Sequence, residues 1–475
     1  MAQTTLLREG DNAFERTIEM LDMIYEFPDD FSDEELEGLA GYLNPDIRNT
    51  VMGLFDIKSA RSVEVFFIKK VIDILREARD ARNEGRKKLV FIPFTFPPEL
   101  IFAFDNLFPV CTEIIAGLAV NVCAGQGERF WDFAMGMGLP DSLCSANTMT
   151  IGSFLMGPGI RPDAIVSNSP GSCNPNAKIH AFAADYLGVP QFILEKPNDD
   201  SERGRELYYE YLCRLIGDLE EFAGEELSAQ KLRTVMERID KLAELYNEYW
   251  ELRKARPCPA HNIFNANLFM LRSLMWGRQE AVDLFQRMID LSRERLRTGE
   301  YTAPEEVARA YITFIPALFD LNGFYPWMEK RGITILGDIL GVQFFPPVDL
   351  SSRESMLRCI SEIGFNFPMI RQMGGESMSL RWLEDLSYVV KDLGADCCIY
   401  CGHHACKHTA GSLAFVRREL MKQTGVPTLV MMGDSFDKRN YPMSMIQQEI
   451  GAFVDNVVSK RKSGKRRRKR KTAAD

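Results

Sequence analysis

The sequence lacks any apolar run long enough to cross a membrane. No stretch of about 20 consecutive apolar residues occurs among the 475 residues, so we expect no transmembrane helix. The first ten residues contain no charged segment followed by an apolar one, which a secretory signal would need. These two absences predict a cytoplasmic protein.

The common motifs for nucleotide binding and hydrolysis are also missing. The sequence contains no Gly-x4-Gly-Lys-Ser/Thr, and no Gly-x-Gly-x-x-Gly follows a predicted strand. It contains neither Gly-x-Ser-x-Gly nor His-Glu-x-x-His. We therefore expect neither ATP hydrolysis nor ordinary dinucleotide binding by this chain.

Positive charge is scarce outside one short segment. The net charge is −10, but residues Lys460 to Lys471 carry ten positive charges and no acid. Removing those ten charges from the total leaves −20 on the rest, which disfavours nucleic-acid binding by the body of the protein. The basic end is interpreted as a disordered, solvated tail. A nucleic-acid, acidic-lipid or docking role for the tail stays open.

The sequence has eleven cysteines but only five histidines. The cysteine count is odd and the chain is long, so a disulfide framework is not expected. Reduced thiols are expected instead, and the question becomes which of them carry chemistry.

What is present is an alternation of strand and helix patterns. Short apolar runs begin at Lys87, Asp163 and Val189, and similar runs resume from Ala308. Alternating strands and helices predict an α/β fold with two Rossmann-like parallel-sheet domains. We expect the following division: an N-terminal helical segment (1–86), a first α/β domain (87–200), a helical insertion (201–300), a second α/β domain (301–458) and the basic tail (459–475). Within the insertion, Ser228 is a helix N-cap candidate ahead of an amphipathic stripe.

The two α/β segments share a weak internal repeat. In the first, Asp163 begins a strand, Cys173 follows ten residues later, and Gly188-Val-Pro precedes the next strand. In the second, Asp396, Cys406 and Gly425-Val-Pro keep the same order and the same ten-residue spacing. Each copy reads as one βαβ unit, whose ligands bind beyond the carboxyl ends of the strands. Chance similarity between two ordinary βαβ units is the alternative.

Three cysteines stand in polar, turn-rich loops that precede helices: Cys144, Cys173 and Cys406. A helix N-terminus favours the thiolate, and these loops are predicted to be accessible. Together they would suit one soft metal centre, whether zinc, Cu(I) or an iron–sulfur cluster. A cluster held by three cysteines leaves one iron with an open position.

A rival metal site is local in sequence. Cys398, Cys401 and Cys406 have spacings that suit zinc, with His403, His404 and His408 nearby. Cys398 lies in a predicted strand, so it would have to leave the core together with Cys401. The remaining cysteines lie mostly in apolar runs and are interpreted as small core residues.

Several segments resemble the subunits of 2-hydroxyacyl-CoA dehydratases and the related benzoyl-CoA reductases. The resemblance covers residues 87–458 and leaves out the N-terminal helical segment and the tail. The segments that carry it are Phe96-Pro-Pro-Glu-Leu-Ile-Phe-Ala, Leu143-Cys-Ser-Ala-Asn-Thr-Met-Thr-Ile-Gly, Ser169-Pro-Gly-Ser-Cys with Gly188-Val-Pro, and Cys406-Lys-His-Thr-Ala-Gly with Gly425-Val-Pro and Gly433-Asp-Ser-Phe-Asp-Lys-Arg-Asn. The last of these is the most specific.

The resemblance implies that Cys144, Cys173 and Cys406 hold a [4Fe–4S] cluster in the α-type subunit of a lyase. It implies a CoA-thioester substrate, a homologous second subunit, and a separate ATP-dependent iron–sulfur activator that donates single electrons. Iron would bind the thioester carbonyl oxygen, and a ketyl radical anion would expel the neighbouring hydroxyl. Thr95 is a candidate proton relay, and His404 and His408 are candidates for contacts with the substrate or a cluster sulfur.

Three other functions stay open. The chain is also compatible with a benzoyl-CoA reductase-type subunit that reduces an aromatic acyl-CoA. A homodimeric reductase with a double cluster is a second alternative. The third, of another class, is a non-enzymatic zinc or iron–sulfur binding protein with its metal on Cys398, Cys401 and Cys406.

Overall fold

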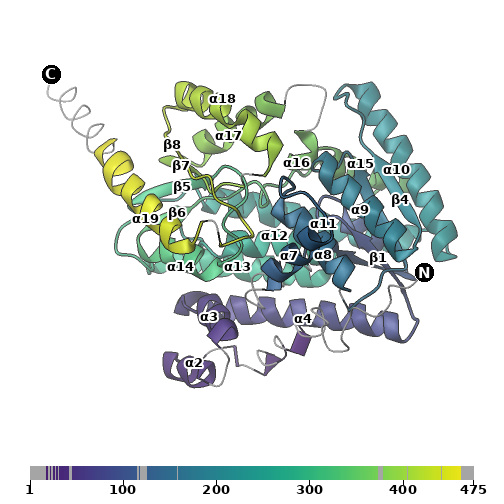
Figure 1. Cartoon of the computed structure of the whole chain (residues 1–475), viewed down its shortest axis with the longest axis horizontal. Coiled ribbons are helices and arrows are strands. Elements are labelled where there is room, and N and C mark those ends of the chain that lie inside the picture. The colour runs from purple at the N-terminus through teal and green to yellow at the C-terminus, as the bar shows by residue number, and fades with distance from the viewer. Residues whose placement is uncertain are drawn as a thin grey trace.

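Two parallel β-sheets, each surrounded by helices, form the body of the molecule (Figure 1). The computed structural model describes residues 18–19, 22, 25–26, 28–29, 31–41, 45–114, 117, 126–157, 159–372, 378–403, 405–439 and 441–461. The expected α/β class, with its two parallel sheets and its helical N-terminal segment, is confirmed. Within the described ranges, no helix combines the length and apolar character of a membrane span.

The first sheet has the strand order β2-β1-β3-β4, and every neighbouring pair is parallel. Its central strands, β1 and β3, are buried along almost their whole length, as expected when helices cover both faces. Its strands are β1 (Lys88–Ile92), β2 (Leu107–Cys111), β3 (Ala164–Ser169) and β4 (Gln191–Glu195). Its helices are α5 (Pro98–Phe102), α7 (Gln126–Gly136), α8 (Ser145–Met156) and α9 (Asn174–Leu187).

The second sheet repeats this arrangement in the order β6-β5-β7-β8, again with parallel neighbours only. Its strands are β5 (Ala308–Ile312), β6 (Ile333–Ile335), β7 (Cys397–Tyr400) and β8 (Thr428–Val430). Its helical elements are α14 (Leu321–Lys330), α15 (Arg353–Phe365), α16 (Pro368–Arg371), α17 (Met378–Asp392), α18 (Lys407–Thr424), α19 (Met443–Phe453) and η2 (Val454–Val458).

The internal repeat is visible in equivalent hydrogen bonds. The Asp163 carboxylate accepts a hydrogen bond from the Leu89 backbone at 2.8 Å, tying the entry of β3 to β1. The Asp396 carboxylate accepts one from the Arg309 backbone at 3.1 Å, tying the entry of β7 to β5. The following helices, α9 and α18, both end at a glycine with left-handed backbone. The two copies are therefore structurally equivalent βαβ units.

Four helices fill the stretch between the sheets: α10 (Glu202–Ala223), α11 (Ala229–Leu252), α12 (Phe264–Leu274) and α13 (Gln279–Thr298). The Ser228 side chain caps α11 by accepting a hydrogen bond from the Lys231 backbone at 3.3 Å, as its sequence predicts. Helix α10 packs on β4 and on α15, so these helices link the two halves.

The N-terminal helices pack against both halves. They are α2 (Asp33–Ala40), α3 (Pro45–Leu54), η1 (Lys58–Ala60) and α4 (Arg61–Asn83). Figure 1 shows α3 and α4 along one side of the molecule, in purple. Helix α4 packs on β1, β2, α12 and α13, and α3 packs on α14.

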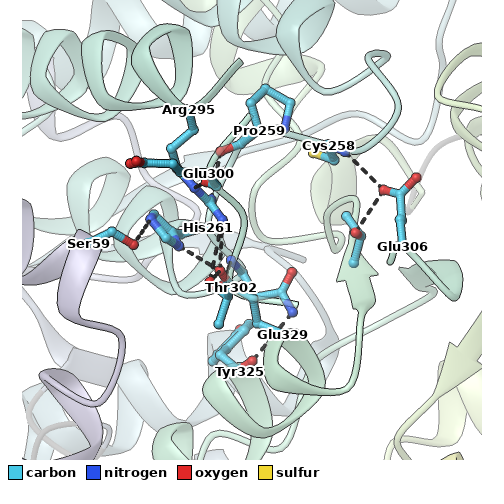
Figure 2. A network of polar contacts seen from close by, with 12 residues as sticks. Ser59, Cys258, Pro259, His261, Arg295, Glu300, Thr302, Glu306, Tyr325 and Glu329 are labelled. Carbon is cyan, nitrogen blue, oxygen red and sulfur yellow. Dashed lines mark hydrogen bonds and ion pairs between the residues drawn. The ribbon is translucent and has the colours of Figure 1, made fainter. Parts of the chain in front are cut away.

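A buried polar network fixes this attachment (Figure 2). The Ser59 hydroxyl, in η1, lies 3.2 Å from the Nε2 atom of His261, whose Nδ1 atom lies 2.7 Å from Glu329. Arg295 of α13 reaches the same carboxylate at 3.3 Å, and Thr302 donates to it at 2.6 Å. The network therefore joins the N-terminal segment to α13 and α14.

Candidate functional site

A large cavity of about 1190 Å³ lies at the carboxyl ends of strands from both sheets. Phe94 and Phe314 line it from the loops after β1 and β5. Cys173 and Cys406 line it from the loops after β3 and β7. This is where open α/β sheets bind ligands, because loops and helix N-termini converge at that edge.

All three cysteines singled out by the sequence line this one cavity. Cys144, Cys173 and Cys406 are the N-cap residues of α8, α9 and α18. Each of these positions is at the partly positive N-terminal end of a helix, which favours a thiolate. The fold brings together thiols that are up to 262 positions apart in the chain.

The Cys144 thiol heads a buried chain of polar side chains. Its sulfur lies 2.7 Å from the Nε2 atom of His403, and the Nδ1 atom of that ring lies 3.5 Å from an Asp434 carboxylate oxygen. The other oxygen of Asp434 accepts hydrogen bonds from the Ser145 hydroxyl at 2.6 Å and the Phe436 backbone at 2.8 Å. His403 and Asp434 are each only 1% exposed, and His403 itself lines the cavity, so these buried side chains hold Cys144 in place at the cavity wall.

The loop that carries His403 has an unusual backbone. His403 has a φ of 130°, which non-glycine residues rarely adopt, and Gly402 before it has a φ of 97°. A Cβ atom on Gly402 would lie 2.3 Å from the Gly433 backbone nitrogen. The loops after β7 and β8 are therefore packed backbone to backbone, and this packing aims His403 at Cys144.

Burial controls the protonation of these thiols. It raises the pKa of Cys144 well above its usual value, and the nearby Cys173 raises it further. Burial also raises the pKa of Cys173, with a smaller effect from Cys406. Without a metal the two thiols therefore retain their protons, and a metal would have to displace them.

Glu113, an acidic residue that lines the cavity, was not predicted from the sequence. One carboxylate oxygen accepts hydrogen bonds from the Phe94 backbone at 3.0 Å and the Thr112 hydroxyl at 2.8 Å. The other accepts one from the Asn176 amide at 2.8 Å. Its position in the sequence could have identified it, because a residue two positions after a buried parallel strand lies at the sheet edge where ligands bind. The sequence also did not single out the contact between His403 and Cys144.

The three other predicted residues have different outcomes. Thr95 is fully buried at the end of β1, accepts hydrogen bonds from the Asn168 amide at 3.1 and 3.2 Å, and does not line the cavity. Its role as a proton relay stays a prediction. His408 does line the cavity, and partial burial lowers its pKa. His404 lies outside the described residues, as does the tail from residue 462 onward.

The structure does not support the local zinc site. Cys398 and Cys401 are buried in the hydrophobic core, whereas Cys406 faces the cavity. Burial raises the pKa of Cys398 to about 12. Across the described part of the chain, no three His, Cys, Asp or Glu side chains lie close enough to hold a single metal ion. A cluster differs in this respect, because its thiolates bind separate irons.

Comparison with known proteins links most of this structure to one family. The family model described as "2-hydroxyglutaryl-CoA dehydratase, D-component" matches residues 93–457. The alpha subunit of (R)-phenyllactyl-CoA dehydratase from Clostridium sporogenes is 21% identical over 396 residues, which are 81% of this chain and 93% of that subunit. The alpha subunit of (R)-2-hydroxyglutaryl-CoA dehydratase from Acidaminococcus fermentans is 21% identical over 303 residues, 62% of this chain and 60% of that subunit.

Proposed function

The chain belongs to the 2-hydroxyglutaryl-CoA dehydratase D-component family, and we propose that it is the iron–sulfur, α-type subunit of a 2-hydroxyacyl-CoA dehydratase. This enzyme would eliminate water from a CoA thioester by single-electron, ketyl radical chemistry. The observation that carries the proposal is the meeting of Cys144, Cys173 and Cys406 at one cavity.

The donor set fits a [4Fe–4S] cluster with one open iron. Three thiols are present, thiolate is the ligand that such clusters take, and helix N-termini stabilise the negative charge on each sulfur. When bound, the cluster would supply single electrons and a Lewis-acidic iron. Because His403 contacts the Cys144 sulfur at 2.7 Å, it would orient this ligand.

Dehydration also needs proton transfer. One group must protonate the leaving hydroxyl, and another must accept a proton from the neighbouring carbon. Glu113 and His408 both line the cavity, and three donors fix the Glu113 carboxylate. We assign the proton transfers to this pair, with Glu113 accepting at a carboxylate oxygen.

Two protein partners follow from this function. Both relatives are alpha subunits, so a homologous second subunit is part of the proposal. The chain lacks a Gly-x4-Gly-Lys-Ser/Thr motif, so the ATP-dependent electron donor would be a separate activator protein. The ten cysteines within the described residues are free thiols, which suits a reduced cytoplasm.

Iron and acid-labile sulfide content after strictly anaerobic purification tests the proposal. The wild-type protein should contain about four irons per chain. Cys144→Ala, Cys173→Ala and Cys406→Ala should each lose most of this iron. Cys398→Ala and Cys401→Ala are the matched controls and should keep it, because these thiols lie in the core.

The opposite pattern would overturn the proposal. Zinc in place of iron, or iron that depends on Cys398 and Cys401 but not on Cys144, would support the metal-binding alternative. Gel filtration of every variant before the metal assay ensures that the content refers to folded protein.

A further inference from the structure

Part of the cavity wall is formed by helices outside the family match. Gly53 and Leu54 of α3 and Phe67, Ile68 and Val71 of α4 all line it. The family model begins only at residue 93. This wall is therefore supplied by a part of the chain outside the matched range, and it borders the same cavity as the three thiols.

Close contacts hold this wall in place. A Cβ atom on Gly53 would lie 2.0 Å from side-chain atoms of Asn322, so α3 meets α14 at its backbone. At the start of α4, Arg61 donates a hydrogen bond to the Phe55 carbonyl at 2.8 Å and another to the Phe31 carbonyl at 3.1 Å. The wall is thus preformed, which favours size selection over adaptation to the ligand.

Helix α12, which packs on α4, and the loop after β1 continue this wall. Ala266, Phe269 and Met270 of α12 line it, and the ring of Phe94 packs edge to face against Phe269 with centroids 6.0 Å apart. The surface is almost entirely apolar. Its polar residues are Asn322 of α14, beside Gly53, and Asn267, whose amide donates a hydrogen bond to the buried Glu64 carboxylate at 2.7 Å.

Charge is distributed unevenly around the cavity. The lining residues that α3, α4 and α12 contribute carry no charged side chain. The lining lysines, Lys178, Lys407 and Lys438, are all exposed, on α9, on α18 and in the loop after β8. A CoA moiety, with its phosphates, suits that exposed cationic rim. A second carboxylate of the substrate would be unpaired against this apolar wall, which is costly.

We propose that α3, α4 and α12 form the acyl pocket and select a 2-hydroxyacyl group with a bulky nonpolar side chain, aromatic or branched, over a dicarboxylic one. This inference rests on the proposed function, since it takes the ligand to be a CoA thioester. Phe67, Ile68 and Val71 are its specificity-determining residues.

Binding of unreactive thioesters tests the pocket without any turnover. Isothermal titration of the anaerobically purified full-length protein would use 3-phenylpropanoyl-CoA, propanoyl-CoA and glutaryl-CoA, none of which carries a hydroxyl to eliminate. The wild-type protein should bind the phenylpropanoyl ester at least about tenfold tighter than either of the others, as a preformed apolar pocket discriminates by buried area.

Three substitutions in the wall test this preference: two add side-chain volume and one removes it. Val71→Phe fills the pocket and should lower the preference for phenylpropanoyl over propanoyl about tenfold, and Val71→Leu should lower it less. Ile68→Ala should also weaken phenylpropanoyl binding by removing contact area. Ile74→Ala is the matched control, because Ile74 is buried on the same helix but does not line the cavity.

The inference fails if glutaryl-CoA binds as tightly as phenylpropanoyl-CoA, or if Ile74→Ala shifts the preference as much as Ile68→Ala does. Iron content separates this failure from failure of the proposed function. Iron lost on cysteine substitution together with unchanged acyl preference in the wall variants would overturn only the pocket. Tight phenylpropanoyl binding by a protein without iron would overturn only the cluster chemistry.

Discussion

At the scale of single residues, burial sets the charge of the groups around the cavity. Glu64, fully buried in α4, has its pKa raised by burial from 4.5 to about 8, against the smaller lowering effect of the Asn267 amide. The stability contributed by protonated Glu64 is therefore fully present below about pH 4.5 and is lost as the pH rises through 8.

We predict that Glu64→Gln stabilises the protein at neutral and higher pH. An amide keeps a hydrogen-bonding group at this position but never ionises, so the variant should gain about 3 kcal/mol relative to wild type at pH 7. The gain should be close to zero at pH 4.5. Denaturant unfolding across this pH range measures the difference.

A second prediction at this scale concerns His403. His403→Phe removes the 2.7 Å contact with Cys144, and the loss of such a supporting contact commonly costs 10–100-fold in metal affinity. The purified variant should therefore contain less iron and release it faster to a chelator. His403→Gln should restore part of the retention, because its amide can still bond the sulfur. His408→Gln, which also changes a cavity histidine, should retain wild-type iron.

At the scale of elements, the attachment of the N-terminal helices depends on one carboxylate. Burial opposes ionisation of Glu329, but His261 and Arg295 outweigh it and hold its pKa at about 2, below the usual 4.5. Burial lowers the pKa of His261, so Arg295 supplies the lasting positive charge. The stability that the ionised Glu329 carboxylate contributes is present above about pH 4.5 and is lost as the pH falls through 2.

We predict that Glu329→Gln lowers the free energy of unfolding by about 3–5 kcal/mol near neutral pH, because Arg295 is left without its buried partner. The loss should shrink as the pH falls from 4.5 toward 2. Thermal unfolding followed by circular dichroism across that range tests both parts. Lys330→Ala changes the neighbouring exposed residue and should cost less than about 1 kcal/mol. Equal losses in the two variants would contradict the prediction.

At the scale of the whole molecule, the site spans both halves of the chain. Cys144 and Cys173 come from the first half and Cys406 from the second, each at a different helix. A group bound to all three would hold the two halves together, and any ligand that binds only the folded state raises its stability.

Removal of the metal should therefore lower the melting temperature of the anaerobically purified protein. Chelation after oxidation should clearly lower the melting temperature of the wild type. It should hardly change that of Cys406→Ala, in which no bound group joins the two halves. Scanning calorimetry before and after chelation measures the melting temperature of each protein. An equal decrease in both proteins would show that stabilisation does not depend on this cysteine.

The sequence was sufficient to predict the βαβ repeat and the three loop cysteines. Asp163 and Asp396 each stand at the start of an equivalent strand, and Cys173 and Cys406 follow them ten residues later. These features could be predicted because turns and the period of apolar residues depend on short stretches of sequence. The partners of these cysteines were harder to predict. Neither His403 nor Glu113 stands in a pattern that identifies its contact, since the atoms that they bond come from other elements.

The sequence by itself determined the α/β class, the two parallel-sheet halves and the residues that cap α8, α9 and α18, because these depend on short-range pattern. Only the tertiary structure decided that Cys144 and Cys406 share a cavity, that Cys398 and Cys401 stay in the core, and that α4 borders the same space. These outcomes depend on how helices pack across the two sheets. Such packing is set by the joint burial of many apolar surfaces, and no single segment encodes it.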